Sequence, residues 1–123
     1  MAVTAAQRQH WQQRLNAEAV AVAQRADAAR RLAQVAAERL LDRWPHLEGV
    51  WLFGSLHDGR FGLSSDVDLA VAGLPDDALL SAMALLEPLQ DGEIVIDLVR
   101  LEDLAPHWQQ RIRERAVLLS AAA

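Results

Sequence analysis

One stretch without glycine or proline, residues 4–43, constrains the fold of this 123-residue chain more than any other feature. Alanine, glutamine, arginine and leucine dominate the stretch, and all four are good helix formers. Apolar residues recur between Trp11 and Leu40 at the spacing of one helix face, which predicts an amphipathic helix about 60 Å long at 1.5 Å per residue. Pro45 ends the helix, because the residue before a proline disfavours helical dihedrals. The alternative to one continuous helix is a break near Asp27.

The rest of the chain alternates short apolar runs with turns, a pattern typical of strands and short helices. Strands are predicted at 50–53, 66–72 and 93–99, helices at 76–89 and 106–115, and a short strand or core contact at 117–119. Pro88 is expected to end or kink the first of these helices, and Pro106 suits the first turn of the second. We therefore expect an α+β domain with a modest core.

The composition excludes several classes of function. The net charge of −5 and the acidic pI near 5.2 argue against duplex nucleic acid or long RNA as the main partner. All basic residues are arginine, so the phosphate-binding lysine of a Walker motif is missing. The absence of cysteine excludes disulfides and thiolate metal sites. No signal-peptide core and no apolar run of membrane-spanning length is present, so we expect no membrane partner and a cytoplasmic location.

Residues able to bind phosphate and metal cluster around the first two predicted strands. Gly54 and Ser55 follow the apolar run 50–53; the glycine lets the backbone approach a phosphate closely, and the serine offers a hydroxyl and an amide N–H. Asp66 and Asp68 stand two apart at the next strand, so their carboxylates share one face and can supply oxygen ligands to magnesium.

A third acid, Asp97, lies inside the last of the three main apolar runs, where an unpaired carboxylate would be costly. The simplest interpretation is that Asp97 lies beside Asp66 and Asp68 and shares their metal. Like charge and desolvation would then raise the carboxylate pKa values in the metal-free protein. Gly-Ser turns and Asp-x-Asp pairs are each common in loops, but together with the third acid they form the minimal set for two-metal phosphoryl or nucleotidyl transfer.

Residues 40–119 resemble the DNA polymerase beta-type nucleotidyltransferase superfamily, and within it the minimal nucleotidyltransferase (MNT) group. The resemblance rests on Gly54-Ser55, the run 65–69 with its Asp-x-Asp pair, Asp97 in its apolar run, and the closing segment 101–119. It implies a nucleotidyltransferase-like small mixed β-sheet flanked by helices, preceded by the long N-terminal helix. The implied domains are an N-terminal helical extension at 1–43 and a minimal nucleotidyltransferase domain at 44–123.

The resemblance also implies roles for the site residues. Gly54 and Ser55 would hold the nucleotide phosphates, and the three aspartates would bind two magnesium ions. Asp66 and Asp68 would ligate both ions, and Asp97 would bind the ion that activates the attacking hydroxyl and would help to take its proton. The hydroxyl would attack the α-phosphate of a nucleoside triphosphate, and pyrophosphate would leave.

Small MNT proteins often act as antitoxins beside a HEPN-domain toxin, a ribonuclease, by transferring AMP from ATP to a toxin tyrosine. The resemblance therefore implies an antitoxin enzyme in a hetero-oligomer with a HEPN-type toxin. Three alternatives stay open: a non-catalytic antitoxin that neutralises by binding, an aminoglycoside-type nucleotidyltransferase acting on a small molecule, and a toxin that its neighbour inhibits. The long helix either docks a toxin or a second copy, with Trp11 as an anchor, or folds back on the sheet to complete the core.

The other polar and aromatic residues are assigned simpler roles. Arg60 and the arginines of the predicted helix 106–115 are interpreted as solvated, and Trp51 and Phe53 as core. The histidines have no metal-ligand spacing and are interpreted as surface or cap residues: His10, His46, His57 and His107.

Overall fold

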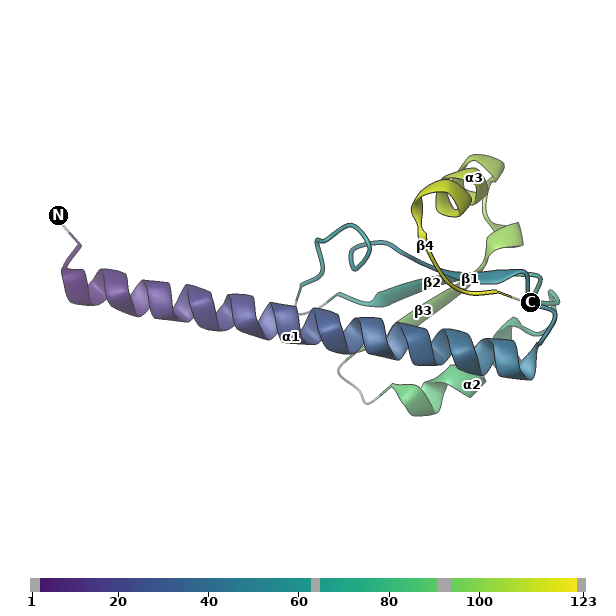
Figure 1. Cartoon of the computed structure of the whole chain (residues 1–123), viewed down its shortest axis with the longest axis horizontal. Helices are drawn as coiled ribbons and strands as arrows, with labels where there is room; N and C mark the ends of the chain where they lie inside the picture. The colour runs from purple at the N-terminus through teal and green to yellow at the C-terminus, as the bar shows by residue number, and fades with distance from the viewer. Residues whose placement is uncertain (1–2, 63–64, 91–93, 122–123) are drawn as a thin grey trace.

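The computed structural model describes residues 3–62, 65–90 and 94–121 and confirms the predicted α+β class. The elements follow the order shown in Figure 1: α1 (Ala5–Arg43), β1 (Gly49–Phe53), β2 (Val67–Ala72), α2 (Leu79–Leu86), η1 (Glu87–Leu89), β3 (Ile96–Arg100), η2 (Leu101–Asp103), α3 (Pro106–Arg115) and β4 (Val117–Ser120). Within these ranges no helix is both long enough and apolar enough to cross a bilayer.

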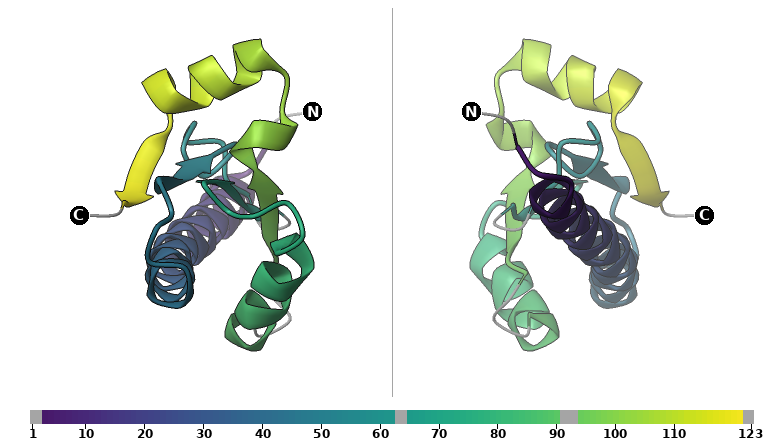
Figure 2. Two further views of the ribbon diagram at one scale, coloured as in Figure 1. Left: turned by 90° about the vertical axis from the view of Figure 1, so that its right-hand side faces the viewer. Right: turned by 90° about the vertical axis from the view of Figure 1, so that its left-hand side faces the viewer.

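A single mixed sheet of four strands, in the order β3-β2-β1-β4, forms the centre of the fold. Strand β1 runs antiparallel to both β2 and β4, whereas β2 and β3 are parallel. Helices α1 and α2 cover one face of the sheet and α3 lies across the other, as the end-on views in Figure 2 show. The predicted mixed sheet flanked by helices is therefore confirmed.

Strand β2 shows how the pleat divides the core into two layers. Val67 and Leu69 are fully buried in the larger cluster, shared with α1 and α2. Ala70 and Ala72 point to the other face, where they pack with Ile112 of α3. Because side chains of a strand alternate between faces, Asp68 lies on the α3 face of the sheet.

Helix α1 is continuous, and the alternative break near Asp27 does not occur. Its N-terminus is closed by a capping box, in which the Gln7 backbone N–H donates to the Thr4 hydroxyl (3.1 Å) and the Thr4 N–H donates to the Gln7 side chain (2.9 Å). Its C-terminal cap is Trp44, directly before the proline that was expected to end it.

The two halves of α1 have different surroundings. Residues 3–20 are all exposed, and Figure 1 shows this half extending past the sheet. The second half packs on the sheet, and its buried face is mostly alanine rather than the larger apolar residues that suggested it; Val35, for instance, is exposed. Alanine has no side chain beyond Cβ, so the helix can approach the sheet closely. The buried residues are Ala26, Ala29, Ala33, Ala36, Ala37 and Leu40.

Several predicted boundaries shift by a few residues. The helix predicted at 76–89 is shorter, Leu79–Leu86, and continues as the 3-10 turn Glu87–Leu89 around Pro88. The strand predicted from 93 begins at Ile96, and residue 93 itself lies outside the described ranges. Helix α3 has the predicted bounds, and the closing segment is a strand paired with β1.

Candidate active site

A row of three side chains crosses the sheet on its α3 face: Phe53 on β1, Asp68 on β2 and Asp97 on β3. Asp68 is the register partner of Phe53 on one side and of Asp97 on the other. Register partners on neighbouring strands point to the same face about 4.8 Å apart, so the two carboxylates lie side by side. Asp66 lies one residue before β2 and is exposed.

The environment of Asp97 differs from the one expected. Its neighbours Ile96 and Leu98 are buried, but Asp97 itself is exposed, because alternation along β3 turns it away from the larger core cluster. The argument that a buried, unpaired Asp97 would be costly was therefore wrong, although Asp97 does lie beside Asp68.

Charge repulsion is concentrated at Asp68, the central acid. Partial burial raises the pKa of this carboxyl above its ordinary value, and the charges of Asp97 and Asp66 raise it further. Within the described residues, no three acidic or histidine side chains converge closely enough to enclose a metal ion. The acids are thus near enough to influence one another without forming a closed cage.

The turn after β1 brings its backbone against Asp68. Gly54 has a positive φ of 77°, and a Cβ at this position would collide with Asp68 Oδ2 and lie 2.9 Å from its Cγ. Only glycine fits here, because it adopts a positive φ without strain and has no Cβ to meet Asp68. The turn is closed by two backbone hydrogen bonds, from Asp58 N–H to the Gly54 carbonyl (2.9 Å) and from Arg60 N–H to the Ser55 carbonyl (2.8 Å).

A cavity of about 680 Å³ opens between α3 and the row formed by Phe53, Asp68 and Asp97. Of the predicted site residues, Gly54, Asp68 and Asp97 line it, whereas Ser55 and Asp66 do not. His57 is exposed, as interpreted, but it also lines the cavity. The cavity therefore joins the glycine turn to two of the three acids.

Two residues interpreted as core or solvated also contribute to this cavity. Trp51 is buried as expected, but Phe53 is only partly buried and lines the cavity. Arg60 lines it as well and is ion-paired with Asp58 at 2.9 Å.

Helix α3 forms the opposite wall, and its arginines are exposed as interpreted, but two of them also face the cavity. Arg111 and Arg115 line the cavity together with Trp108 and Ile112. These positions follow the i, i+3, i+4, i+7 spacing of one helix face. That spacing was a signal in the sequence that could have separated these two arginines from Arg113.

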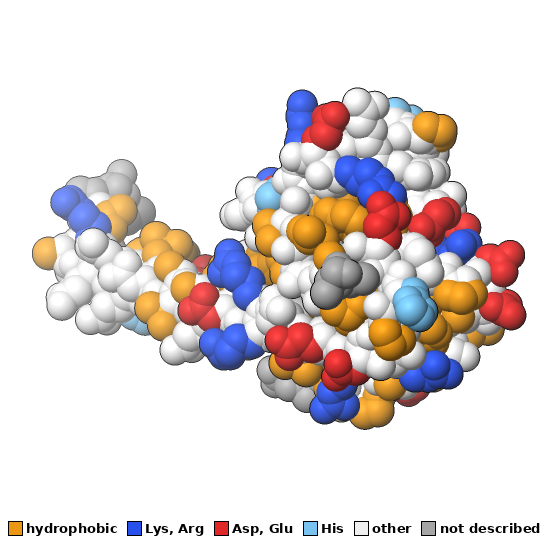
Figure 3. Space-filling model, turned by 45° about the vertical axis from the view of Figure 1, so that its right-hand side comes forward, with side chains coloured by type: hydrophobic (Ala, Val, Ile, Leu, Met, Phe, Trp, Pro, Cys, Tyr) orange, Lys and Arg blue, Asp and Glu red, His pale blue; other side chains and the backbone are white. Residues whose placement is uncertain are grey.

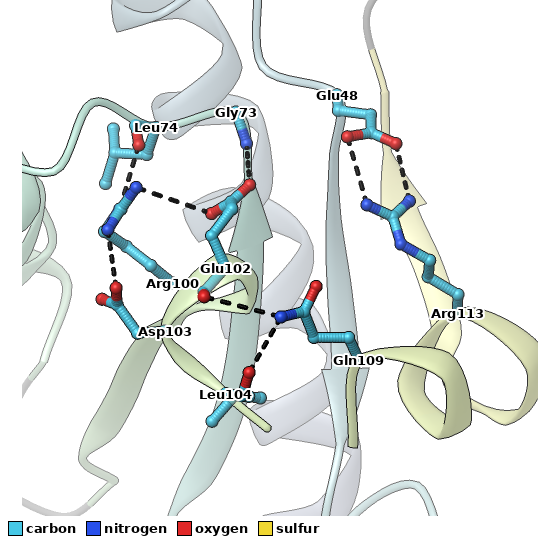
Figure 4. Close-up of polar contacts among 9 residues, drawn as sticks. All are labelled: Glu48, Gly73, Leu74, Arg100, Glu102, Asp103, Leu104, Gln109 and Arg113. Carbon is cyan, nitrogen blue, oxygen red and sulfur yellow. Dashed lines mark hydrogen bonds and ion pairs between the residues drawn. The ribbon is translucent and has the colours of Figure 1, made fainter. Parts of the chain in front are cut away.

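Polar contacts hold α3 over the sheet (Figure 4). Arg113 donates two hydrogen bonds to the Glu48 carboxylate, at 2.6 and 3.2 Å, which lowers the pKa of Glu48 and raises the pKa of Arg113. Gln109 donates to the Leu104 carbonyl (2.8 Å) and to the Glu102 carbonyl (3.5 Å), tying the helix to the turn before it. These contacts set the position of the cavity wall.

The comparisons with known proteins agree with this fold and arrangement. The sequence matches the polymerase beta nucleotidyltransferase family over residues 36–122, and the chain belongs to this family. No curated protein matches the sequence significantly.

Among solved structures, this chain is similar to a protein chain in a crystal structure of a toxin-antitoxin with AMP-PNP. The two are 27% identical with a TM-score of 0.57, over 72% of this chain and 73% of the other. It also has the fold of a chain from a mutant of the toxin-antitoxin MntA-HpeT, with 24% identity and a TM-score of 0.54 over 68% of each chain.

Proposed function

We propose that this chain is an antitoxin enzyme that transfers AMP from ATP to a hydroxyl, first of all a tyrosine hydroxyl, of a cognate HEPN-type toxin. The observation that carries the proposal is the pair Asp68 and Asp97, which lie side by side and line a cavity, with Asp68 packed against Gly54. The toxin partner is supported by the 27% identity to a chain solved as part of a toxin-antitoxin with AMP-PNP.

The donor set suits magnesium. Asp66, Asp68 and Asp97 offer only carboxylate oxygens, and within the described residues no arginine forms an ion pair with any of them. Partial burial and then repulsion from Asp97 and Asp66 raise the pKa of Asp68, and a bound cation would relieve that repulsion. These three residues would hold two ions, whose role would be to neutralise phosphate charge and lower the pKa of the acceptor hydroxyl.

The chain's own residues would orient and deprotonate the reactants. The contact between Gly54 and Asp68 means that a phosphate bound at the turn would lie directly beside the carboxylates. The acceptor oxygen would form a new bond to the α-phosphorus, the bond to pyrophosphate would break, and the hydroxyl proton would pass to Asp97. The products would be the AMP ester of the acceptor and pyrophosphate.

The test is the intact mass of the toxin encoded beside this chain after incubation with the chain, ATP and magnesium. We expect a gain of one or more AMP units, and no gain with the Asp66→Asn/Asp68→Asn variant, which keeps side-chain volume but removes both charges. No gain with the wild-type protein would refute the catalytic proposal.

One observation favours neutralisation by binding as a second candidate. Residues 3–20 of α1 are exposed and carry large apolar side chains, among them Trp11, which is 58% exposed, and Leu15. Figure 3 shows hydrophobic side chains along this projecting half. A stable complex that protects against the toxin without any mass gain would establish this function. If the two proteins form no complex and the toxin gains no mass, the search turns to small-molecule acceptors.

A further inference from the structure

Two arginines of α3, Arg111 and Arg115, line the cavity that also contains Asp68 and Asp97. We propose that these arginines bind the β- and γ-phosphates of the nucleoside triphosphate and stay with the pyrophosphate as it leaves. This inference rests on the proposed nucleotidyltransferase function and assigns it a phosphate-binding wall.

The geometry of the helix directs both arginines to the cavity. Residues four apart on a helix lie on one face, so Arg111 and Arg115 form a pair along α3. Ile112, beside them on the helix, is buried against the sheet and fixes how the helix is rotated. Arg113 lies on the far side, where Glu48 binds its guanidinium at 2.6 Å.

The two cavity arginines differ from Arg60 and Arg113 in their ion pairing. Across the described ranges, no acidic side chain forms an ion pair with Arg111 or Arg115, whereas Arg60 and Arg113 each have a carboxylate partner. The guanidinium of Arg111 instead lies over the Trp108 ring, 5.5 Å from its centroid. This contact orients the side chain and leaves its N–H donors available to a ligand.

The charge distribution in the cavity fits a triphosphate. The α-phosphorus must lie near Asp68 and Asp97, where the acceptor hydroxyl is activated, so the β- and γ-phosphates extend away from these two carboxylates. Planar guanidinium groups donate paired hydrogen bonds that match phosphate oxygens. The net charge of the chain is −5, and at one cavity wall two arginines that pair with no acid in the described part of the chain provide the positive charge that the departing pyrophosphate requires.

The experiment measures direct binding of α,β-methylene-ATP and of AMP in magnesium by isothermal titration calorimetry. The methylene bridge replaces the oxygen at the bond that would break, so the ligand persists during the titration. The variants are Arg111→Gln and Arg115→Gln, with Arg39→Gln as the matched control, because Arg39 is an exposed arginine of α1 that does not line the cavity. Arg111→Lys and Arg115→Lys keep the charge and remove the planar fork, and thermal unfolding shows that each variant is folded.

We expect each cavity-facing glutamine variant to weaken binding of the triphosphate analogue roughly ten- to a hundredfold, as for a lost charge-assisted hydrogen bond. AMP binding and the control should be unchanged, and the lysine variants should be intermediate. Unchanged triphosphate affinity, equal weakening for AMP and triphosphate, or an equal effect of the control would overturn the assignment. If the folded wild-type protein binds neither nucleotide, the proposed function itself fails, and this inference fails with it.

Discussion

The contact between Gly54 and Asp68 predicts that two glycines with the same backbone conformation respond very differently to alanine. Gly54 and Gly59 have φ values of +77° and +76° in the same turn. A Cβ on Gly59 would meet nothing within 4 Å, whereas a Cβ on Gly54 would run into the Asp68 carboxylate. Gly59→Ala therefore measures backbone strain alone, and Gly54→Ala measures the same strain plus a collision in the site.

The expected losses follow from these two components. Left-handed backbone costs an L-residue about 1–2 kcal/mol, and this is the whole expected effect of Gly59→Ala. Forcing a side chain into occupied space adds about 1–3 kcal/mol, so Gly54→Ala should lose about 2–5 kcal/mol of unfolding free energy. For a chain of this size each kcal/mol lowers the melting temperature by about 4 °C.

Urea denaturation measures the free energies, and the proposed AMP-transfer reaction measures the consequence for the site. Because the added methyl must displace the Asp68 carboxylate, we expect Gly54→Ala to lose activity about a hundredfold, as misplacement by about 1 Å can do. Gly59→Ala should keep the wild-type rate. Equal losses of stability in the two variants would refute the argument, because they would mean that Asp68 is not packed against Gly54.

Three further predictions concern charge and packing. Partial burial and the neighbouring acids raise the pKa of Asp68, so its ionisation destabilises the metal-free fold; this penalty is absent below the ordinary value of 3.8 and is complete above the raised pKa. Asp68→Asn should therefore raise the metal-free melting temperature at pH 7 but not at pH 3, and an unchanged melting temperature at pH 7 would contradict the repulsion. The bidentate pair of Glu48 with Arg113 should show a coupling energy of about 0.2–1 kcal/mol in a double-mutant cycle at pH 7. Arg113 lowers the pKa of Glu48, so the coupling should be present above the ordinary value of 4.5 and disappear as pH falls through the lowered pKa; coupling that persists in acid would exclude an ionic origin. Ala36→Leu, on the buried face of α1, should cost about 1–3 kcal/mol in urea denaturation, whereas Ala19→Leu on the exposed half should be nearly neutral; equal effects would mean that the two halves are packed alike.

Local sequence patterns were sufficient to predict most of the elements. The absence of glycine and proline from residues 4–43 predicted one long helix, and α1 covers Ala5–Arg43. The strand predicted at 66–72 is β2, which begins at Val67, so that Asp68 lies on it and Asp66 one residue before it, and Gly54 lies in the preceding turn as predicted. These features depend on neighbours a few residues away, through dihedral preferences and the two-residue period of a strand, so they can be read without knowing the fold.

Other features depend on which segments lie against each other, and only the tertiary structure decided them. Asp97 is exposed because its side chain lies on the α3 face of the sheet, where the cavity opens. The sequence offered no sign that this face would stay open. The division of α1 into a buried and an exposed half follows from where the sheet ends, although the helix composition is similar throughout. Burial is a property of two surfaces in contact, so one segment's sequence does not determine it.

The candidate site shows the same division. The sequence by itself determined the chemical groups: a glycine turn and three carboxylates on or directly beside strands. The tertiary structure decided which groups lie next to one another. It aligns Asp68 with Asp97 in register, and it places α3 across that face with Arg111 toward the cavity. The physical reason is that residue type and local spacing fix what a side chain can do, whereas strand register and helix rotation, set by long-range packing, fix what it can reach.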